Sequence, residues 1–201
     1  MSNTKEHIIE AASRLMHLRG FNHTSIDEVL KESGVGKGNF YYYFKSKEEL
    51  GYAIIESNLK RFSDHVMRKA FGNHKDALDQ VDDFLDIILE VQRQRNCAGG
   101  CPLGNMAMEL SDIHEGFRRK FQGVFEDWGV QLATVLRKGK ADRRLGDNAD
   151  PEVLSQFLVA SVEGGILLTK VKKDIRVLEN CFKELKRHIR MYVGGPTVLS
   201  H

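Results

Sequence analysis

The chain has 201 residues, of which 41% are hydrophobic and 29% are charged, and its formal net charge is +2. This length allows a hydrophobic core without disulfides, and the composition is that of an ordinary globular protein. A net charge so close to zero excludes non-specific DNA-packaging proteins, which bind through many basic contacts. The three cysteines are an odd number without metal-ligand spacing, so we expect neither a disulfide framework nor a bound metal.

The N-terminal residues carry no export signal, because 1–6 lack a basic stretch followed by an apolar one. No uninterrupted apolar run reaches the roughly 18 residues of a membrane span. We therefore expect a cytoplasmic protein that has no membrane partner.

Helical periodicity dominates the chain, which has only three prolines and lacks strand-like alternation. The first helix should end at Gly20. Ser25 and Glu28 form a capping box, in which each side chain accepts a hydrogen bond from the other's backbone, so a short second helix should follow and end at Gly34. A third short helix is predicted from Lys37 to Phe44.

A second capping box at 46–49 should open a long helix that runs from Leu50 to about Ala70. Two short helices that are joined by a glycine turn and framed by longer helices form the helix-turn-helix arrangement. Beyond Gly72 the pattern predicts longer helices at about 76–94, 102–110, 115–140, 150–173 and 175–192, the last ended by the Gly-Gly-Pro run at 194–196.

Charged residues are unevenly distributed along the N-terminal part, although their charges sum to zero. The first fifty residues hold seven basic and seven acidic side chains, yet the stretch 34–47 has three lysines and no acid.

The third short helix should have one apolar and one polar face. At about 100° per residue, Phe40 and Phe44 lie on one side and Tyr42 points the opposite way. The remaining polar or small residues near Tyr42 are Gly38, Asn39 and Lys45. Tyrosine and asparagine donate to phosphate, lysine supplies charge, and glycine allows close backbone approach. The outer face therefore suits a DNA groove, whereas a core-only role for the aromatic run would bury all three tyrosines.

At 24–30, 34–44 and 45–50 the chain resembles the TetR family of transcriptional regulators. The resemblance implies that the helix from Lys37 is the recognition helix, anchored by Phe40 and Phe44. It implies base contacts from Lys37, Gly38 and Tyr41, and phosphate contacts from Thr24, Ser25, Asn39, Tyr42, Tyr43 and Lys47. Two residues depart from the family pattern: Gly36 stands where a serine cap is frequent, and Asn39 stands where threonine or serine is frequent.

The resemblance also implies the domain organisation and the function. Residues 1–50 would be a three-helix helix-turn-helix domain that binds double-stranded operator DNA, and residues 51–201 an all-helical domain for ligand binding and dimerisation. The protein would be a homodimeric repressor without a cofactor, released from its operator by a small-molecule effector. A short recognition helix makes few contacts alone, and two copies one DNA turn apart read a palindrome.

By the same analogy, the last two long helices would form the dimer interface. Small and large residues alternate there, and the interface candidates are Phe157, Ser161, Gly164, Gly165 and Leu168. The same small residues could instead border a ligand cavity, and the sequence does not separate the two roles.

Residues 100–110 are similar to the cysteine-containing motif of TetR subgroups that respond to electrophiles, oxidants or small unsaturated acids. Cys101 would cap the helix that begins at Pro102, where unpaired backbone N–H groups favour a thiolate. Lys170 falls where that subgroup places a partner amine. The plainer alternative is a small buried Cys101 and a solvated Lys170.

Further cavity candidates are Met106, Phe121, Phe125 and Trp128, although such residues at helical spacing are more often core. A small helical enzyme or electrophile scavenger that uses Cys101 is the rival function. No histidine base lies close to Cys101 in sequence, and an enzyme would leave the first fifty residues unexplained, so we expect no enzyme.

Overall fold

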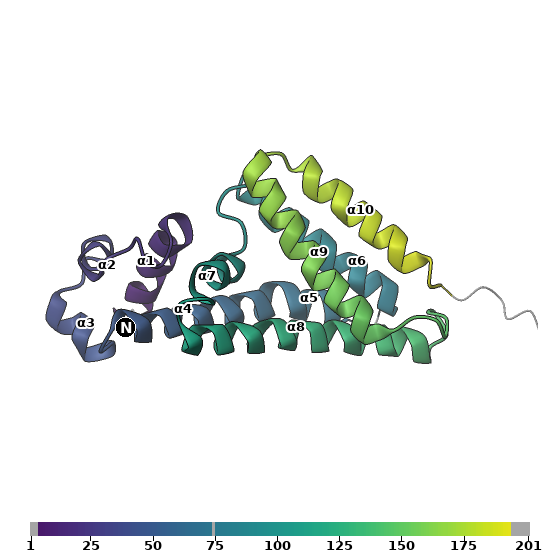
Figure 1. The fold of residues 1–201 in the computed structure, drawn as a ribbon, viewed down its shortest axis with the longest axis horizontal. Helices are drawn as coiled ribbons and strands as arrows, with labels where there is room; N and C mark the ends of the chain where they lie inside the picture. Colours follow the sequence, from purple (N-terminus) through teal and green to yellow (C-terminus); the bar gives the residue numbers. More distant parts are fainter. Residues whose placement is uncertain (1–3, 74, 194–201) are drawn as a thin grey trace, which may run out of the picture. The chain divides into compact units, whose positions relative to one another are not determined.

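The computed structural model describes residues 4–73 and 75–193, and over these ranges it consists of α-helices and a short π-helical segment, joined by loops (Figure 1). The helices are α1 (Thr4–Arg19), α2 (Ile26–Ser33), α3 (Lys37–Tyr43), α4 (Lys47–Phe62), α5 (Arg68–Phe71), α6 (Ala77–Gln94), α7 (Pro102–Leu110), α8 (Glu115–Ala141), α9 (Pro151–Lys172) and α10 (Arg176–Arg190). The predicted all-α fold class is confirmed, since those ranges contain no β-strand. The Gly-Gly-Pro run expected to end the last helix lies outside the described residues.

By its internal contacts the chain divides into two compact units, each made of two stretches of sequence. The first unit joins Met1–Phe62 to Cys101–Phe121, and the second joins Ser63–Gly100 to Gln122–His201. The whole of α4, the whole of α7 and the start of α8 thus pack with the N-terminal helices, whereas the sequence suggested a division at residue 50. Contacts between distant segments decide this grouping, and helical periodicity does not report them.

Helix α2 begins and ends where its sequence signals predict. The Ser25 hydroxyl accepts the backbone N–H of Glu28 at 3.2 Å, and the Glu28 carboxylate accepts the backbone N–H of Ser25 at 2.8 Å. The Ser25 backbone N–H, together with the Ser25 hydroxyl that donates to the same carboxylate at 2.9 Å, lowers the pKa of the Glu28 carboxyl. At the other end, Gly34 has a φ of +66°, the left-handed conformation that glycine adopts readily.

The long helix predicted after Ser46 is interrupted. Helix α4 ends at Phe62, a π-helical segment follows at Ser63–Met67, and α5 completes the run to Phe71. No glycine or proline occurs between 52 and 71, so the sequence has no residue that signals the interruption. The boundary between the two units falls at the first residue of this segment.

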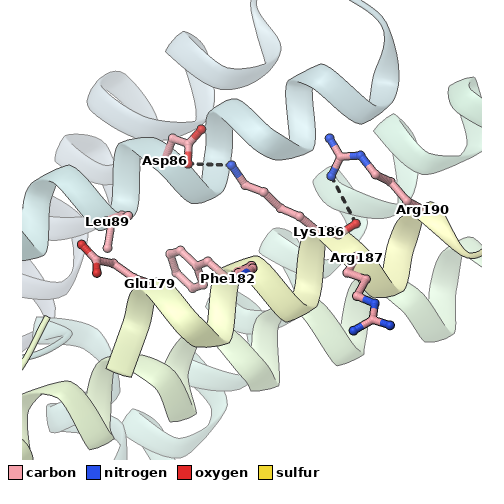
Figure 2. A pocket seen from close by; sticks show the side chains of 8 residues that line it. Asp86, Leu89, Glu179, Phe182, Lys186, Arg187 and Arg190 are labelled. Carbon is pink, nitrogen blue, oxygen red and sulfur yellow. Dashed lines mark hydrogen bonds and ion pairs between the residues drawn. The ribbon is translucent and has the colours of Figure 1, made fainter. Parts of the chain in front are cut away.

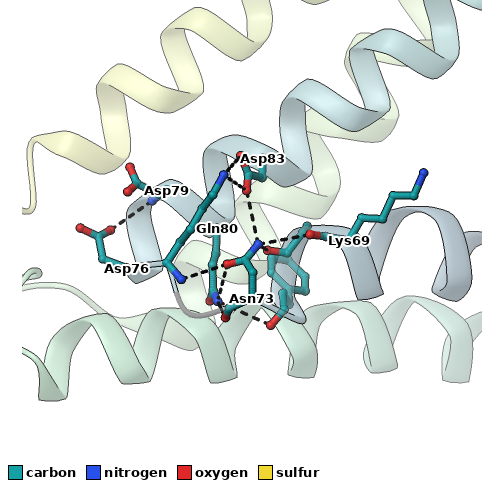
Figure 3. A network of polar contacts seen from close by, with 9 residues as sticks. Lys69, Asn73, Asp76, Asp79, Gln80 and Asp83 are labelled. Atoms are coloured by element: carbon teal, nitrogen blue, oxygen red, sulfur yellow. Dashed lines mark hydrogen bonds and ion pairs between the residues drawn. The ribbon is translucent and has the colours of Figure 1, made fainter.

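In the second unit, a polar network joins α5 to α6 (Figure 3). The buried Gln80 amide donates to the backbone carbonyl of Asn73 at 2.8 Å, and Asn73 in turn donates to the Lys69 and Ala70 carbonyls. Asp76 caps α6 by accepting the N–H groups of Leu78 and Asp79. Side chains of the network thus provide hydrogen-bond partners for backbone carbonyls at the end of α5 and for backbone N–H groups at the start of α6, which have no partner within their own helix.

Candidate nucleic-acid interface

Helix α3 has the two faces that its sequence predicts. Phe40 and Phe44 are 0% and 1% exposed, whereas Tyr42 is 76% exposed and Tyr41 is 40% exposed. The two phenylalanine rings lie 5.8 Å apart and are tilted at 48°. The phenylalanines therefore anchor α3 in the first unit, and its opposite side meets solvent.

The exposed side of α3 carries donors and little bulk. Lys37, Gly38 and Asn39 are exposed, and the rings of Tyr42 and Tyr43 meet edge-on at 4.9 Å. A Cβ added at Gly38 would meet no heavy atom within 4 Å. Since glycine in a helix costs about 0.5–1 kcal/mol relative to alanine, and the chain has room for a side chain here, packing does not require this glycine.

The start of α3 is less supported than that of α2. Gly36 occupies the N-cap position, and its lack of a side chain leaves the cap without a side-chain hydrogen bond. A serine at this position could supply that hydrogen bond through its hydroxyl.

The residues outside α3 that are expected to contact phosphate differ in how exposed they are to solvent. Thr24 is 1% exposed, and its hydroxyl donates to the Gly20 carbonyl at 2.9 Å. Thr24 therefore supports the turn, and its contact with phosphate stays a prediction. Ser25 is exposed at the N-cap of α2.

Lys47 is half-buried, and its ammonium lies 4.6 Å from the centre of the Phe21 ring. Burial lowers the pKa of Lys47, while the nearby Glu109 and Glu28 charges act in the opposite direction. The ammonium thus has partners within the first unit before any DNA is considered.

Comparison with known proteins places this geometry in a family. Residues 8–54 match the family described as "Bacterial regulatory proteins, tetR family", and residues 77–185 match the "Tetracyclin repressor-like, C-terminal domain". An uncharacterised HTH-type transcriptional regulator from Lactococcus lactis subsp. lactis is 33% identical, over 92% of this chain and 93% of its own length. The chain belongs to the tetR family. It is accordingly a DNA-binding transcriptional regulator with a helix-turn-helix.

Solved structures agree with this assignment. A TetR transcriptional regulator from Chloroflexus aurantiacus has a TM-score of 0.87 at 25% identity, and the match covers 94% of this chain and 96% of that one. The transcriptional repressor NemR of Escherichia coli is 26% identical over 98% of this chain and 96% of its own length. The structure of the NemR reduced form has a TM-score of 0.84, and the match covers 97% and 99% of the two chains.

The predicted cysteine cap of α7 is present in this tetR-family chain. Helix α7 begins at Pro102, and the Cys101 sulfur accepts the backbone N–H of Gly104 at 3.3 Å. Cys101 is half-buried, Cys97 is buried, and burial raises the pKa of the Cys181 thiol. Within the described residues no group of three or more histidine, cysteine or acidic side chains could hold a metal ion.

The other sensor candidates are spread over both units. Cys101, Met106 and Phe121 belong to the first unit, and Phe125, Trp128 and Lys170 to the second. Met106, Phe121 and Trp128 are buried, while Phe125 and Lys170 are half-buried. Phe125 meets Trp128 edge-on at 5.2 Å. The two units thus hold three candidates each, and their role as a cavity lining stays a prediction.

A hollow of about 460 Å³ lies between α6 and α10 (Figure 2). Leu89 and Phe182 contribute its apolar part, and its lining includes none of the predicted sensor residues. Its acids are already paired: Asp86 lies 2.6 Å from the Lys186 ammonium, and Glu179 lies 2.7 Å from the Arg93 guanidinium. The hollow therefore neither supports nor contradicts the predicted effector site.

The dimer candidates on α9 separate into two groups. Phe157 and Leu168 are exposed, and a Cβ added at Gly164 would meet nothing within 4 Å. Gly165 faces inward, since its added Cβ would lie 2.8 Å from Leu178 of α10 in the same chain. Gly165 thus packs against α10 within the chain, and its place between copies stays a prediction. The carbonyl of the half-buried Ser161 accepts the Cys181 thiol at 3.6 Å.

Helix α9 is also long and apolar enough, by length and composition alone, to cross a membrane. A single helix of this kind is weak evidence for a membrane-spanning segment, because core helices of soluble proteins meet the same criterion.

Sequence reasoning missed one polar contact in the first unit. The Glu109 carboxylate, in the last turn of α7, accepts the backbone N–H groups of Phe21 and Asn22 at 2.8 and 2.7 Å. A carboxylate at the C-terminal end of a helix is disfavoured by the helix dipole, and this position was the signal that Glu109 needs a partner elsewhere.

Proposed function

We propose that this regulator is a cytoplasmic repressor that binds double-stranded operator DNA as a homodimer and leaves it when a small effector acts on α7. The observation that carries the proposal is the division of α3 into a buried side, Phe40 and Phe44, and an exposed side around Tyr42. An exposed helix face with phenol, amide, ammonium and bare backbone groups suits the major groove and its phosphates. On this view Lys37, Gly38 and Tyr41 contact bases.

The remaining proposed DNA contacts go to phosphate. Asn39, Tyr42, Tyr43 and Ser25 would supply hydrogen-bond donors there, and Lys47 would supply charge at the edge of the interface. Such contacts fix the register of the protein on the duplex, while the base contacts carry the sequence preference.

The proposed dimer uses the exposed side of α9. Val153, Phe157, Leu168 and Val171 are exposed apolar residues at helical spacing, and Gly164 leaves open space among them. Exposed apolar stripes of this kind mark contacts with other proteins. A two-fold contact here would provide two copies of α3 for two half-sites.

The proposed sensor is Cys101. Of the three thiols, Cys97 is buried and burial raises the pKa of Cys181, whereas Cys101 accepts a backbone N–H at a helix N-terminus. The relative NemR is a repressor whose structure has been solved in a reduced form. We infer that an electrophile or oxidant reacts with Cys101 and that Met106 and Phe121 of the same unit assist recognition of the effector.

Binding of the purified protein to DNA that flanks its own gene tests the proposal. Nanomolar, salt-dependent and sequence-specific binding by a dimer is expected, followed by release on addition of a Michael acceptor such as N-ethylmaleimide. Cys101→Ser should keep the binding and lose the release, while the control Cys181→Ser keeps both. Release that persists in Cys101→Ser would exclude Cys101 as the sensor, and absence of specific binding by the unmodified protein would exclude the repressor function.

A further inference from the structure

The turn between α1 and α2 is held by a side chain from a distant part of the sequence. Glu109 of α7 places one carboxylate oxygen 2.8 Å from the backbone nitrogen of Phe21 and the other 2.7 Å from that of Asn22. The Phe21 contact spans 88 residues of sequence. Each N–H donates to its own ionised oxygen, and hydrogen bonds to charged groups are stronger than neutral ones.

Gly20 makes room for this carboxylate. Its φ of +95° is one that residues with a side chain rarely adopt, and an added Cβ would lie 3.0 Å from a Glu109 oxygen. The backbone conformation and the space at Gly20 thus both favour the contact with α7.

The same turn is also held by α4. The Lys47 ammonium lies 3.5 Å from the Asn22 carbonyl oxygen and over the Phe21 ring. The Phe21 ring also packs edge-on against Phe117 at 5.4 Å. Gly51 of α4 lies beneath both rings, since its added Cβ would be 2.8 Å from each. The dipeptide Phe21–Asn22 therefore has its N–H groups, one carbonyl and one ring fixed from outside the turn.

This turn leads directly into the helices that carry the DNA-binding face. Two residues after Asn22 comes Thr24, whose hydroxyl donates to the Gly20 carbonyl, and Ser25 follows as the N-cap of α2. Whatever fixes the turn thus fixes the direction in which α2 leaves α1, and α3 follows after one further glycine turn. Cys101 caps the same helix that carries Glu109, eight residues or about 12 Å away along the helix axis.

We propose that Glu109 is a positioning residue, which sets the orientation of α2 and α3 and through which α7 controls operator affinity. The proposal rests on the proposed DNA-binding function and deepens it, because it names the contact by which a change in α7 reaches the helix-turn-helix. Glu109 itself touches no DNA in this account.

The test is Glu109→Gln in the full chain. Glutamine has the same shape but only one accepting oxygen, and its amide NH₂ would face a backbone donor. We expect the dissociation constant for the operator to rise about tenfold, from the loss of one charge-assisted bond. Non-specific DNA should bind within about twofold of the wild type, since that binding depends on charge rather than on helix placement. Exchange of the Phe21 and Asn22 amide hydrogens should become faster.

The matched control is Glu126→Gln on α8, where an exposed carboxylate accepts a hydrogen bond from Gln122. It removes the same charge and should leave operator affinity and the two amides unchanged. Active protein is titrated stoichiometrically, so partial unfolding lowers specific and non-specific binding together and is recognised. If Glu109→Gln does not fold, Glu109→Asp, which keeps both oxygens on a shorter side chain, is measured in the same way.

The outcomes separate this inference from the function on which it rests. A wild-type protein that prefers no sequence removes the repressor function and the positioning role together. Specific wild-type binding with an unchanged ratio of specific to non-specific affinity in Glu109→Gln overturns the positioning role alone, whether or not the amides exchange faster. A loss of that ratio together with faster exchange supports it.

Discussion

Replacing Gly38 with alanine should separate the stability of the protein from its function. Gly38 lies in the first turn of α3, and a Cβ there meets no heavy atom within 4 Å. Alanine is better than glycine in a helix by roughly 0.5–1 kcal/mol, so Gly38→Ala should stabilise the first unit. A gain of about 1 kcal/mol raises the melting temperature by roughly 2–4 °C in a chain of this size.

The same methyl group should weaken operator binding. Gly38 and Tyr42 are four residues apart, so they share the exposed side of α3. If DNA approaches this side within the roughly 3.5–4 Å of van der Waals contact, an added carbon forces the helix away from it. We expect about a tenfold loss of operator affinity, which corresponds to about 1.4 kcal/mol.

Gly123→Ala is the control for this experiment. Gly123 lies inside α8, and its added Cβ also meets nothing within 4 Å. The control should gain similar stability and keep wild-type affinity, as measured by thermal unfolding and fluorescence anisotropy at one salt concentration. If Gly38→Ala becomes more stable and still binds operator like the wild type, the reasoning about the outer face of α3 is refuted.

Four further substitutions test packing and capping in the two units. Phe40→Ala should lower the free energy of unfolding by about 3–5 kcal/mol in urea titrations, because the ring is fully buried; a loss below 1 kcal/mol would contradict its anchoring role. Gly165→Ala should cost about 1–3 kcal/mol, since its Cβ would crowd Leu178, whereas Gly164→Ala should cost nothing. Equal effects of the two glycine substitutions would remove the distinction drawn on α9. Asp76→Ala should cost about 1 kcal/mol at pH 7 through the lost cap. Backbone hydrogen bonds from Asp79 and Leu78 and the charge of Arg144 lower the pKa of Asp76, so this stability is present above its unfolded value and lost as pH falls through the folded one. The difference between wild type and Asp76→Ala should therefore shrink below about pH 4, and a constant difference would show that the carboxylate charge is irrelevant.

Local signals predicted most of the helices, because they act within one or two turns of the chain. The Ser25–Glu28 capping box, the left-handed Gly34 and the proline at the start of α7 each lie where the sequence indicated. The inward side of α3 was also predictable, since the four-residue spacing of Phe40 and Phe44 puts both rings on one face.

What the sequence did not reveal depends on contacts between distant segments. The Glu109 contact with the α1–α2 turn, the burial of Thr24 and the inward direction of Gly165 all follow from tertiary packing. The π-helical segment at Ser63–Met67 has no glycine or proline to announce it. Periodicity describes one face of one helix, and it does not tell which other helix covers that face.

Photo-cross-linking from position 42 tests most directly whether the exposed side of α3 binds DNA. Tyr42 is replaced by the photoreactive analogue benzoylphenylalanine, which keeps an aromatic ring at an exposed position, and the complex with operator DNA is irradiated. The same analogue at Met191, which is 72% exposed on the second unit, serves as the reference. We expect a covalent adduct with operator DNA from position 42 and none from position 191. A specific complex that gives no adduct at position 42 would show that another surface of the protein holds the DNA.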